Sequence, residues 1–255
     1  MDYVTILGQR IDLYTKEEIL DVIGQTIVSK QKKIFLYLNA HGSNLAVKYS
    51  WLSEFYDKAD VVYADGKGIQ FASRILSGKA PPHLPLTEWI WGLLRQCSEK
   101  KQSIYLLGGS EEVIYEATQH LKSQNSNLLI AGSHHGYFRK SGSESEEVVR
   151  QINSVTPDIL LVGFGMPAQE EWLNENFSSL QIHVAMTIGG AIDVLAGRRR
   201  NVPAFVRNFG LEWLFRLFEE PKRLFVRYIF GNPKFAARVI VEKFKSKNAK
   251  GKSKP

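Results

Sequence analysis

The segment ADGKG at residues 64–68 places a carboxylate between glycines at the end of an apolar run. Asp65 follows the run ADVVYA, and Gly66 and Gly68 carry no side chains that would cover it. A carboxylate held open in this way can accept a proton from a reacting hydroxyl group, which makes Asp65 a candidate general base. The alternative is that Asp65 only caps the helix whose pattern begins near Gly68.

Small or amide residues end several other apolar runs in the same manner. These residues are Asn39, Gly108, Gly109, Gly163, Gly165, Gly189 and Gly190. Glycines at such positions expose backbone N–H groups, and N–H groups at the start of a helix bind phosphate. The chemistry they could perform is therefore the binding of an anionic ligand.

The runs themselves have the pattern of buried strands. They are short, rich in β-branched residues or leucine, and span residues 33–40, 59–65, 103–109, 127–133, 157–165 and 183–190. Continuous apolar runs are typical of parallel strands that are covered on both faces. Amphipathic stretches at 110–124 and 143–155 lie between them, and Ser110 followed by two glutamates indicates a helix start. The alternation predicts an α/β fold with a mainly parallel sheet and flanking helices.

In such a sheet, ligands bind outside the carboxyl ends of the strands. A single glycine pair at a strand end could be no more than a turn. Five strand ends that share this pattern favour a binding site, so we expect them to converge on one crevice.

Common nucleotide and metal motifs are absent from the sequence. The segment GFGMPAQ has Ala168 where a dinucleotide fingerprint needs its third glycine, and LLGGSEEV lacks the lysine and hydroxyl residue of a P-loop. No His, Asp and Glu residues have metal-ligand spacing, and the single cysteine, Cys97, excludes a thiolate cluster. We expect neither a metal nor another cofactor.

The N-terminus lacks the basic start and long apolar core of a signal peptide. No run approaches the roughly 20 apolar residues of a membrane span. The sequence therefore predicts a protein that stays in the cytoplasm.

The charge is divided unevenly along the chain. The net charge is +7, but residues 195–255 hold 16 Lys and Arg against 4 Asp and Glu. We divide the chain into an α/β core (1–202), a helical appendage (203–245) and a basic, disordered tail (246–255). A basic segment of this kind can meet nucleic acid, a membrane surface or an acidic substrate.

Aromatic and basic residues alternate at helical spacing after residue 203. Phe205, Phe209, Trp213 and Leu217 form one apolar stripe, and a second stripe follows Pro221. Pro221 and Pro233 divide the segment into two or three short helices. The mixture favours a helix lying on an anionic membrane surface. A core-facing helix is one alternative, and stacking on RNA is another, although no nucleic-acid motif supports it.

Several motifs together resemble the WecG/TagA/CpsF glycosyltransferase family, glycosyltransferase family 26. They are ADG-x-G at 64–68, D-x-LLVGFGMPAQE-x-W at 158–172, GGAIDVLAG at 189–197 and GLEWLFRLFEEPKRLFVRY at 210–228. The resemblance runs from ILGQRIDLYTKEEIL near the start to GNPKF at 231–235 and covers nearly the whole chain.

The resemblance implies an inverting, metal-independent transfer of a hexose-type sugar from a UDP-sugar to a polyprenyl-diphosphate-linked saccharide. It implies a role in cell-surface polysaccharide biosynthesis, such as exopolysaccharide or cell-wall polymer. The fold it implies is Rossmann-like, of the GT-E type, with a C-terminal helical, basic appendage. The enzyme would be peripheral on the inner face of the cytoplasmic membrane. A homo-oligomer is compatible with the resemblance, and nucleic acid is not an expected partner.

The family motifs assign roles to residues of this chain. Asp65 matches the proposed catalytic aspartate. Gln169 matches a motif glutamine expected to meet the nucleotide or donor sugar, and Asn39 matches an asparagine at the end of the first family strand. The leaving diphosphate would be stabilised by Arg216, Arg223 and Arg227 of the appendage and by the glycine N–H groups, Gly66 included.

Three positions depart from the family pattern and leave the donor open. Tyr37 stands where the family often has threonine, His83 replaces an arginine, and Glu88 replaces an aspartate. They are expected to face the substrates. The donors compatible with the resemblance are UDP-N-acetylmannosamine, UDP-glucose and UDP-N-acetylmannosaminuronate.

A second hypothesis is a non-catalytic nucleotide- or RNA-binding protein that uses the same crevice and basic tail. Asp65 distinguishes the two, because a protein that only binds a diphosphate gains nothing from a carboxylate that repels it.

Overall fold

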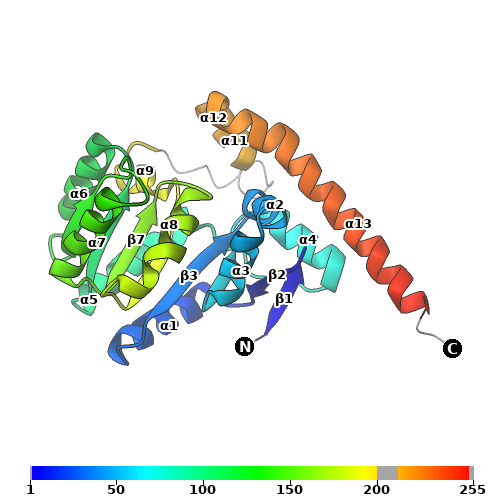
Figure 1. Cartoon of the computed structure of the whole chain (residues 1–255), viewed down its shortest axis with the longest axis horizontal. Coiled ribbons are helices and arrows are strands. Elements are labelled where there is room, and N and C mark those ends of the chain that lie inside the picture. The colour runs from blue at the N-terminus through cyan, green and yellow to red at the C-terminus, as the bar shows by residue number, and fades with distance from the viewer. Residues whose placement is uncertain (1, 200–211, 253–255) are drawn as a thin grey trace.

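The computed structural model describes residues 2–199 and 212–252. Its centre is a six-stranded sheet in the order β4-β3-β8-β7-β5-β6, in which every neighbouring pair is parallel. The strands are β3 (Lys33–Leu38), β4 (Val61–Ala64), β5 (Ser103–Gly108), β6 (Leu129–His134), β7 (Ile159–Gly163) and β8 (Val184–Thr187). Each falls within or overlaps one of the six predicted runs, so the predicted Rossmann-like α/β fold is confirmed (Figure 1).

Helices cover both faces of the sheet. One face carries α2 (Ala40–Lys48), α3 (Ser50–Lys58), α7 (Ser143–Val155) and α8 (Ala168–Asn176), whose apolar residues join one core cluster. The other carries α1 (Lys16–Val28), α5 (Leu86–Glu99), α6 (Glu111–Gln124) and α9 (Ala191–Leu195), which build a second cluster. A 3₁₀ turn, η1 (Phe177–Ser179), follows α8, and α4 (Lys67–Ser77) follows β4. Because both faces are covered, the strands are apolar on both sides, as their sequences predict.

Local capping fixes where the helices begin. Ser110 accepts a hydrogen bond from the backbone N–H of Val113 at 3.2 Å, which confirms the predicted start of α6. Thr15 and Glu18 form a capping box at α1. Asn39 caps α2 through its side-chain oxygen. These caps satisfy N–H groups that the first turn of a helix leaves without partners.

The N-terminal residues form an antiparallel hairpin that the sequence analysis did not predict. Its strands are β1 (Tyr3–Ile6) and β2 (Gln9–Asp12). The side chain of Asp12 accepts a hydrogen bond from the backbone N–H of Val62 at 2.8 Å, which joins the hairpin to β4.

The C-terminal part consists of α11 (Glu212–Glu219), α12 (Pro221–Phe225), a π-helical turn η2 (Val226–Phe230) and the long helix α13 (Gly231–Lys252). We call residues 212–252 the C-terminal helical region. Pro221 begins α12 and Pro233 lies in the first turn of α13, where a missing N–H costs no hydrogen bond.

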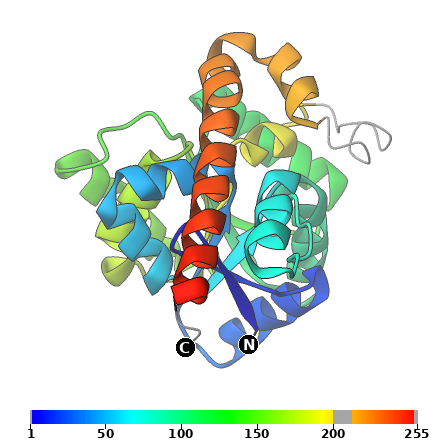
Figure 2. The same cartoon turned by 90° about the vertical axis from the view of Figure 1, so that its right-hand side faces the viewer.

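Helix α13 corrects the prediction of a disordered tail, since residues 246–252 continue the helix. Lysine and alanine are good helix formers, and the first half of the helix is anchored on the core. Phe235 and Val239 are buried in the core cluster, and Arg238 donates to the side chain of Asn44 in α2 at 2.8 Å. Figures 1 and 2 show α13 crossing α2 and α4. Residues 253–255, and Phe205 and Phe209 of the predicted apolar stripe, lie outside the described residues.

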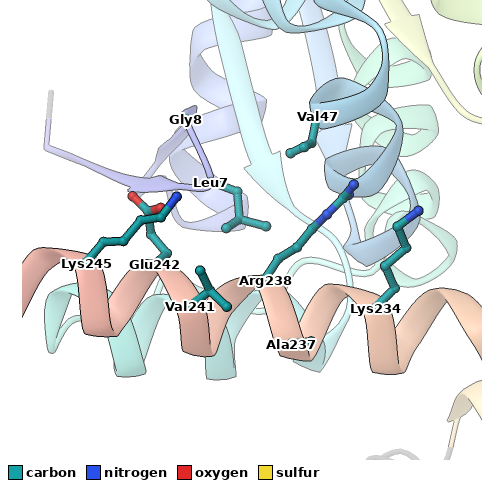
Figure 3. A pocket seen from close by; sticks show the side chains of 9 residues that line it. All are labelled: Leu7, Gly8, Val47, Lys234, Ala237, Arg238, Val241, Glu242 and Lys245. Carbon is teal, nitrogen blue, oxygen red and sulfur yellow. The ribbon is translucent and has the colours of Figure 1, made fainter.

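A shallow groove of about 470 Å³ lies between α13, the β1–β2 turn and α2 (Figure 3). Leu7, Val47 and Val241 give it an apolar lining, and Arg238 and Lys245 are among its charged residues. None of its lining residues comes from the carboxyl ends of the parallel strands. Within residues 2–199 and 212–252, no helix combines the length and apolar character needed to cross a bilayer.

Candidate functional site

The predicted site residues converge on the carboxyl edge of the sheet. The connections that follow neighbouring strands diverge there, because β3 continues into α2 on one face of the sheet while β8 leads to α9 on the other. The same divergence separates β7, which leads to α8, from β5, which leads to α6. Divergence of this kind opens the crevice in which α/β proteins bind their ligands.

Asp65 lies at the carboxyl end of β4, on the edge of this crevice. Its backbone N–H donates to Leu38 at 2.9 Å, and its side chain is partly exposed. The N-cap of α4 is Gly66 (φ 90°), and no side chain caps that helix. Asp65 therefore does not occupy the N-cap position of α4, and its role as the base stays a prediction.

The hydroxyl groups of two tyrosines lie within the electrostatic reach of Asp65. Burial raises the pKa of Tyr63, and the Asp65 carboxylate raises it further. Tyr37 on the neighbouring strand has a raised pKa because of burial, with contributions from Glu170 and Asp65, whereas the positive charge of Arg227 lowers it. Tyr37 therefore lies within the electrostatic reach of both Asp65 and Arg227, which are far apart in the sequence.

Tyr37 also touches the loop after β8. A Cβ added to Gly189 (φ 47°) would lie 2.5 Å from the Tyr37 hydroxyl, so both the backbone conformation and the close contact require glycine there. Gly189 therefore has a structural role, in the packing of the loop against Tyr37.

Gly108, Gly109 and Gly163 are packed tightly against one another at the carboxyl ends of β5 and β7. A Cβ at Gly108 would lie 2.3 Å from the carbonyl oxygen of Gly163, and the N–H of Gly109 donates to that same oxygen at 3.2 Å. Gly66 and Gly165, both with φ of 90°, face open space instead, since nothing lies within 4 Å of an added Cβ. These two have room for a ligand beside the backbone, while the first three shape the crevice.

Gln169, at the start of α8, is fully buried beneath the loops that follow β7 and β8. Its side-chain oxygen accepts hydrogen bonds from the N–H groups of Gly165 at 3.2 Å and Gly189 at 3.1 Å. Its amide nitrogen donates to the Tyr37 hydroxyl at 3.2 Å and to Glu170 at 2.7 Å. The structure therefore places Gln169 as a bridge between two loops, and its expected contact with the donor stays a prediction.

Asn39 is likewise occupied within the protein, because its side-chain oxygen accepts from the N–H of Gly42 at 2.9 Å as the cap of α2. Its contact with a nucleotide also stays a prediction. His83 lies in the segment before α5, where the N–H of the next residue, Leu84, donates to the carbonyl of Ala64 at 3.2 Å. This hydrogen bond brings the His83 segment to the strand end that carries Asp65.

The C-terminal helical region contributes Arg227 to the same place. Burial lowers the pKa of His41 to about 4, and the positive charge of Arg227 contributes to the shift. Arg227 also stacks over the ring of Tyr228, 5.6 Å from its centroid, and its buried Nε has no hydrogen-bond partner in the part of the chain that the structure describes. Arg216 is buried and pairs with Glu219 at 3.0 Å. The side chain of Arg223 lies outside the described part of the chain.

The sequence analysis missed two charged residues near the site. Arg199 contacts the carbonyl of Gly190 at 3.4 Å and pairs with Asp193 and with Glu220, which connects the loop after β8 to the C-terminal helical region. Glu170 is fully buried, and burial raises the pKa of its carboxyl group to about 7. Glu170 belongs to the GFGMPAQE motif, but only the fold shows that its side chain points inward.

Within the described residues, no three His, Cys, Asp or Glu side chains form a group that could hold a metal ion. The chemistry that the described side chains can perform is proton acceptance by Asp65 and stabilisation of an anion by Arg227 and backbone N–H groups.

Comparison with known proteins gives one consistent result. The model of the "Glycosyl transferase WecG/TagA/CpsF family" matches residues 4–249. Proteins from Staphylococcus aureus strains MW2, NCTC 8325 and MRSA252 are each 30% identical over 250 residues, covering 97% of this chain and 96% of the relative. Each of these relatives is named an N-acetylglucosaminyldiphosphoundecaprenol N-acetyl-beta-D-mannosaminyltransferase.

Proposed function

The chain belongs to the WecG/TagA/CpsF family of glycosyltransferases, and from this membership and the site we propose that it performs an inverting transfer from a UDP-sugar to a polyprenyl-diphosphate-linked saccharide. The reaction contributes to cell-surface polysaccharide. UDP-N-acetylmannosamine is the first donor to test, because the relatives are N-acetylmannosaminyltransferases. UDP-glucose and UDP-N-acetylmannosaminuronate are the other two.

The observation that carries the proposal is the convergence of Asp65 and Arg227 on Tyr37. Inverting transfer needs one base to take the proton of the acceptor hydroxyl as its oxygen attacks the anomeric carbon. It also needs positive charge where the bond to the UDP oxygen breaks and negative charge develops. Asp65 and Arg227, whose charges both reach Tyr37, are the groups that we assign to these two functions.

In this mechanism Asp65 accepts the proton, and UDP leaves with the bonding electron pair on its diphosphate. Arg227 and the N–H groups of the loops beside Gly66 and Gly165 stabilise the diphosphate. Arg216 and Arg223 are further candidates for this role. No step needs a metal ion, since the cationic groups take its place.

The acceptor's lipid tail places the reaction at the inner surface of the cytoplasmic membrane. The C-terminal helical region exposes large apolar side chains, namely Trp213, Phe218, Phe225, Val226, Ile229, Phe230, Ile240, Val241 and Phe244. Exposed lysines lie among them, including Lys222, Lys234 and Lys245. Apolar side chains that enter the headgroup region, combined with lysines that attract anionic lipids, support peripheral membrane binding.

The test is a screen of the three UDP-sugars with a synthetic lipid-diphosphate saccharide as acceptor, with UDP release and the glycosylated lipid as readouts. We expect one donor to give both products in equal amounts. Binding of UDP without turnover of any donor would favour a non-catalytic nucleotide-binding protein instead.

A further inference from the structure

A pair of consecutive buried residues, Gln169 and Glu170, lies beneath the crevice. Both side chains are 0% exposed. The Gln169 nitrogen donates to one carboxylate oxygen of Glu170 at 2.7 Å, while the other carboxylate oxygen is buried and has no hydrogen-bond partner among the described residues. A buried carboxylate with an unsatisfied oxygen costs free energy, so its retention calls for a function.

The hydrogen bonds of Gln169 show what that function is. Its amide oxygen accepts from the backbone N–H groups of Gly165 and Gly189, and these groups can only donate. At the other end of the amide, the Tyr37 hydroxyl can either donate or accept, so it does not distinguish the amide nitrogen from the oxygen.

Above its pKa of about 7 the Glu170 carboxylate can only accept hydrogen bonds, so at pH 8 it would repel the amide oxygen if the amide were reversed. A reversed amide would point its nitrogen at the two glycine N–H groups and leave both of them without an acceptor. Glu170 therefore keeps the amide in the one orientation that joins the loop after β7 to the loop after β8.

We propose that Glu170 is a positioning residue that acts through Gln169 to hold the Gly165 and Gly189 loops in the arrangement that binds the donor diphosphate. The substrate part of this inference rests on the proposed function. The loop-positioning part rests on the hydrogen bonds alone.

The informative variant is Glu170→Met, because methionine has nearly the same length and is an apolar helix former, but is at most a weak acceptor. Glu170→Gln is the rescue variant, since its side-chain oxygen can still accept from Gln169. Glu171→Met is the matched control, because Glu171 is the exposed neighbour on the same helix. All variants are made in the full chain.

Hydrogen–deuterium exchange of the unliganded protein reads the loops directly. With Glu170→Met we expect hydrogen exchange in peptides covering 163–169 and 187–191 to become about tenfold faster. The reason is that the free energy of local unfolding of the two loops falls by about the contribution of one hydrogen bond. Peptides covering β5 should not change, and Glu170→Gln and Glu171→Met should resemble the wild type. Unchanged exchange in both loops with Glu170→Met, or equal increases with Glu170→Gln, would overturn the inference.

Thermal unfolding and UDP binding complete the test. Replacing the buried carboxylate by methionine should leave the unfolding temperature at pH 8 unchanged or raise it. Faster exchange in the two loops of a variant that is as stable as the wild type then indicates a positioning role for Glu170 rather than general destabilisation. UDP should bind Glu170→Met about tenfold more weakly, and the KM for the UDP-sugar should rise while kcat stays within about twofold. Failure of the wild type to bind UDP would contradict the proposed function, whereas the exchange comparison would still decide the role of Glu170.

Discussion

The positive charge of Arg227 acts on His41, a residue that lies far from it in the sequence, in the first turn of α2. Burial of the imidazole and this charge together lower the pKa of His41 to about 4. The imidazole is therefore neutral at physiological pH and does not add to the positive charge at the crevice. The pKa of His41 reports where Arg227 lies, independently of any assay of activity.

Replacement of Arg227 by glutamine should change both the pKa of His41 and the rate of sugar transfer. The pKa of His41 should rise while staying below its ordinary value, because burial remains; NMR titration of the imidazole measures it. Sugar transfer should fall between about tenfold and a thousandfold, since the leaving diphosphate loses a cation. Arg150→Gln is the control, because Arg150 is exposed and, among the contacts described, pairs with its helix neighbour Glu147. An unchanged His41 pKa together with full activity would remove Arg227 from the site.

Replacement of Asp65 by asparagine should reduce transfer by about a hundredfold or more while UDP binding stays nearly intact. The amide keeps the size of the carboxylate and loses its basicity. Turnover of donor and acceptor measures the first effect, and calorimetric titration with UDP measures the second. Turnover close to that of the wild type would show that another group takes the proton.

Transfer should continue in the presence of EDTA. The proposed mechanism balances the charge of the leaving diphosphate with arginine side chains and N–H groups, so chelation of divalent cations removes nothing that it needs. Rates measured with EDTA and with added Mg²⁺ or Mn²⁺ should agree within about twofold. A strict requirement for either metal would point to a different route for the leaving group.

The sequence was sufficient to predict the six strands of the sheet and the glycines at their ends. Strands buried on both faces need continuous apolar runs, and the carboxyl ends of parallel strands meet at one edge whatever the details of the loops. The β1–β2 hairpin escaped prediction because its strands are only four residues long and partly exposed. Strands of four residues can be assigned from the sequence when every position is buried, as in β4 and β8, but not when exposed or polar residues interrupt the apolar run.

The contributions of Glu170, His41 and Arg199 to the site could not be predicted from the sequence. Each depends on a contact across segments that come together only on folding, such as the pairing of Arg199 with Glu220. The extent of α13 escaped prediction for a related reason. A lysine-rich segment has the composition of a disordered tail, and here it continues a helix that Phe235 and Val239 hold against the core.

Stability should depend on pH through Glu170. Burial raises the pKa of this carboxyl group from an ordinary 4.5 to about 7, so the folded protein holds its proton more tightly than the unfolded chain does. Its contribution to stability is therefore fully present below about pH 4.5 and is lost as the pH rises through about 7. Tyr37 and Tyr56, which face Glu170, have raised pKa values and stay protonated across this range.

Glu170→Gln cannot ionise and should remove this dependence. Its free energy of unfolding in urea should match the wild type near pH 5 and exceed it near pH 8.5 by as much as about 3 kcal/mol. The difference between the two pH values is the quantity to measure, because it cancels any effect of the substitution on packing. A wild type that gains stability relative to Glu170→Gln as the pH rises would contradict the assignment.

Binding to anionic vesicles should depend on exposed aromatic side chains of the C-terminal helical region. Removing the whole region would also remove Phe235 and Val239 from the core, so point substitutions are the cleaner test. Phe218 and Phe230 are 79% and 63% exposed and can be replaced by serine without opening a cavity. Because insertion of each ring into the headgroup region contributes up to about 2 kcal/mol, the double variant should bind between about tenfold and a thousandfold more weakly in co-sedimentation.

Tyr115→Ser is the control for this comparison, since Tyr115 is a 65% exposed aromatic residue on α6 of the core. Turnover of a short, water-soluble acceptor separates membrane binding from catalysis. The Phe218 and Phe230 variant should keep its rate on that acceptor and lose it on a lipid acceptor in vesicles, whereas Arg227→Gln should lose both.

Vesicle binding that survives loss of the two phenylalanines but disappears in high salt would show that the lysines alone hold the protein at the surface, because salt screens charges and leaves apolar insertion in place. Equal losses with Tyr115→Ser would show that the C-terminal helical region is not the membrane-binding surface.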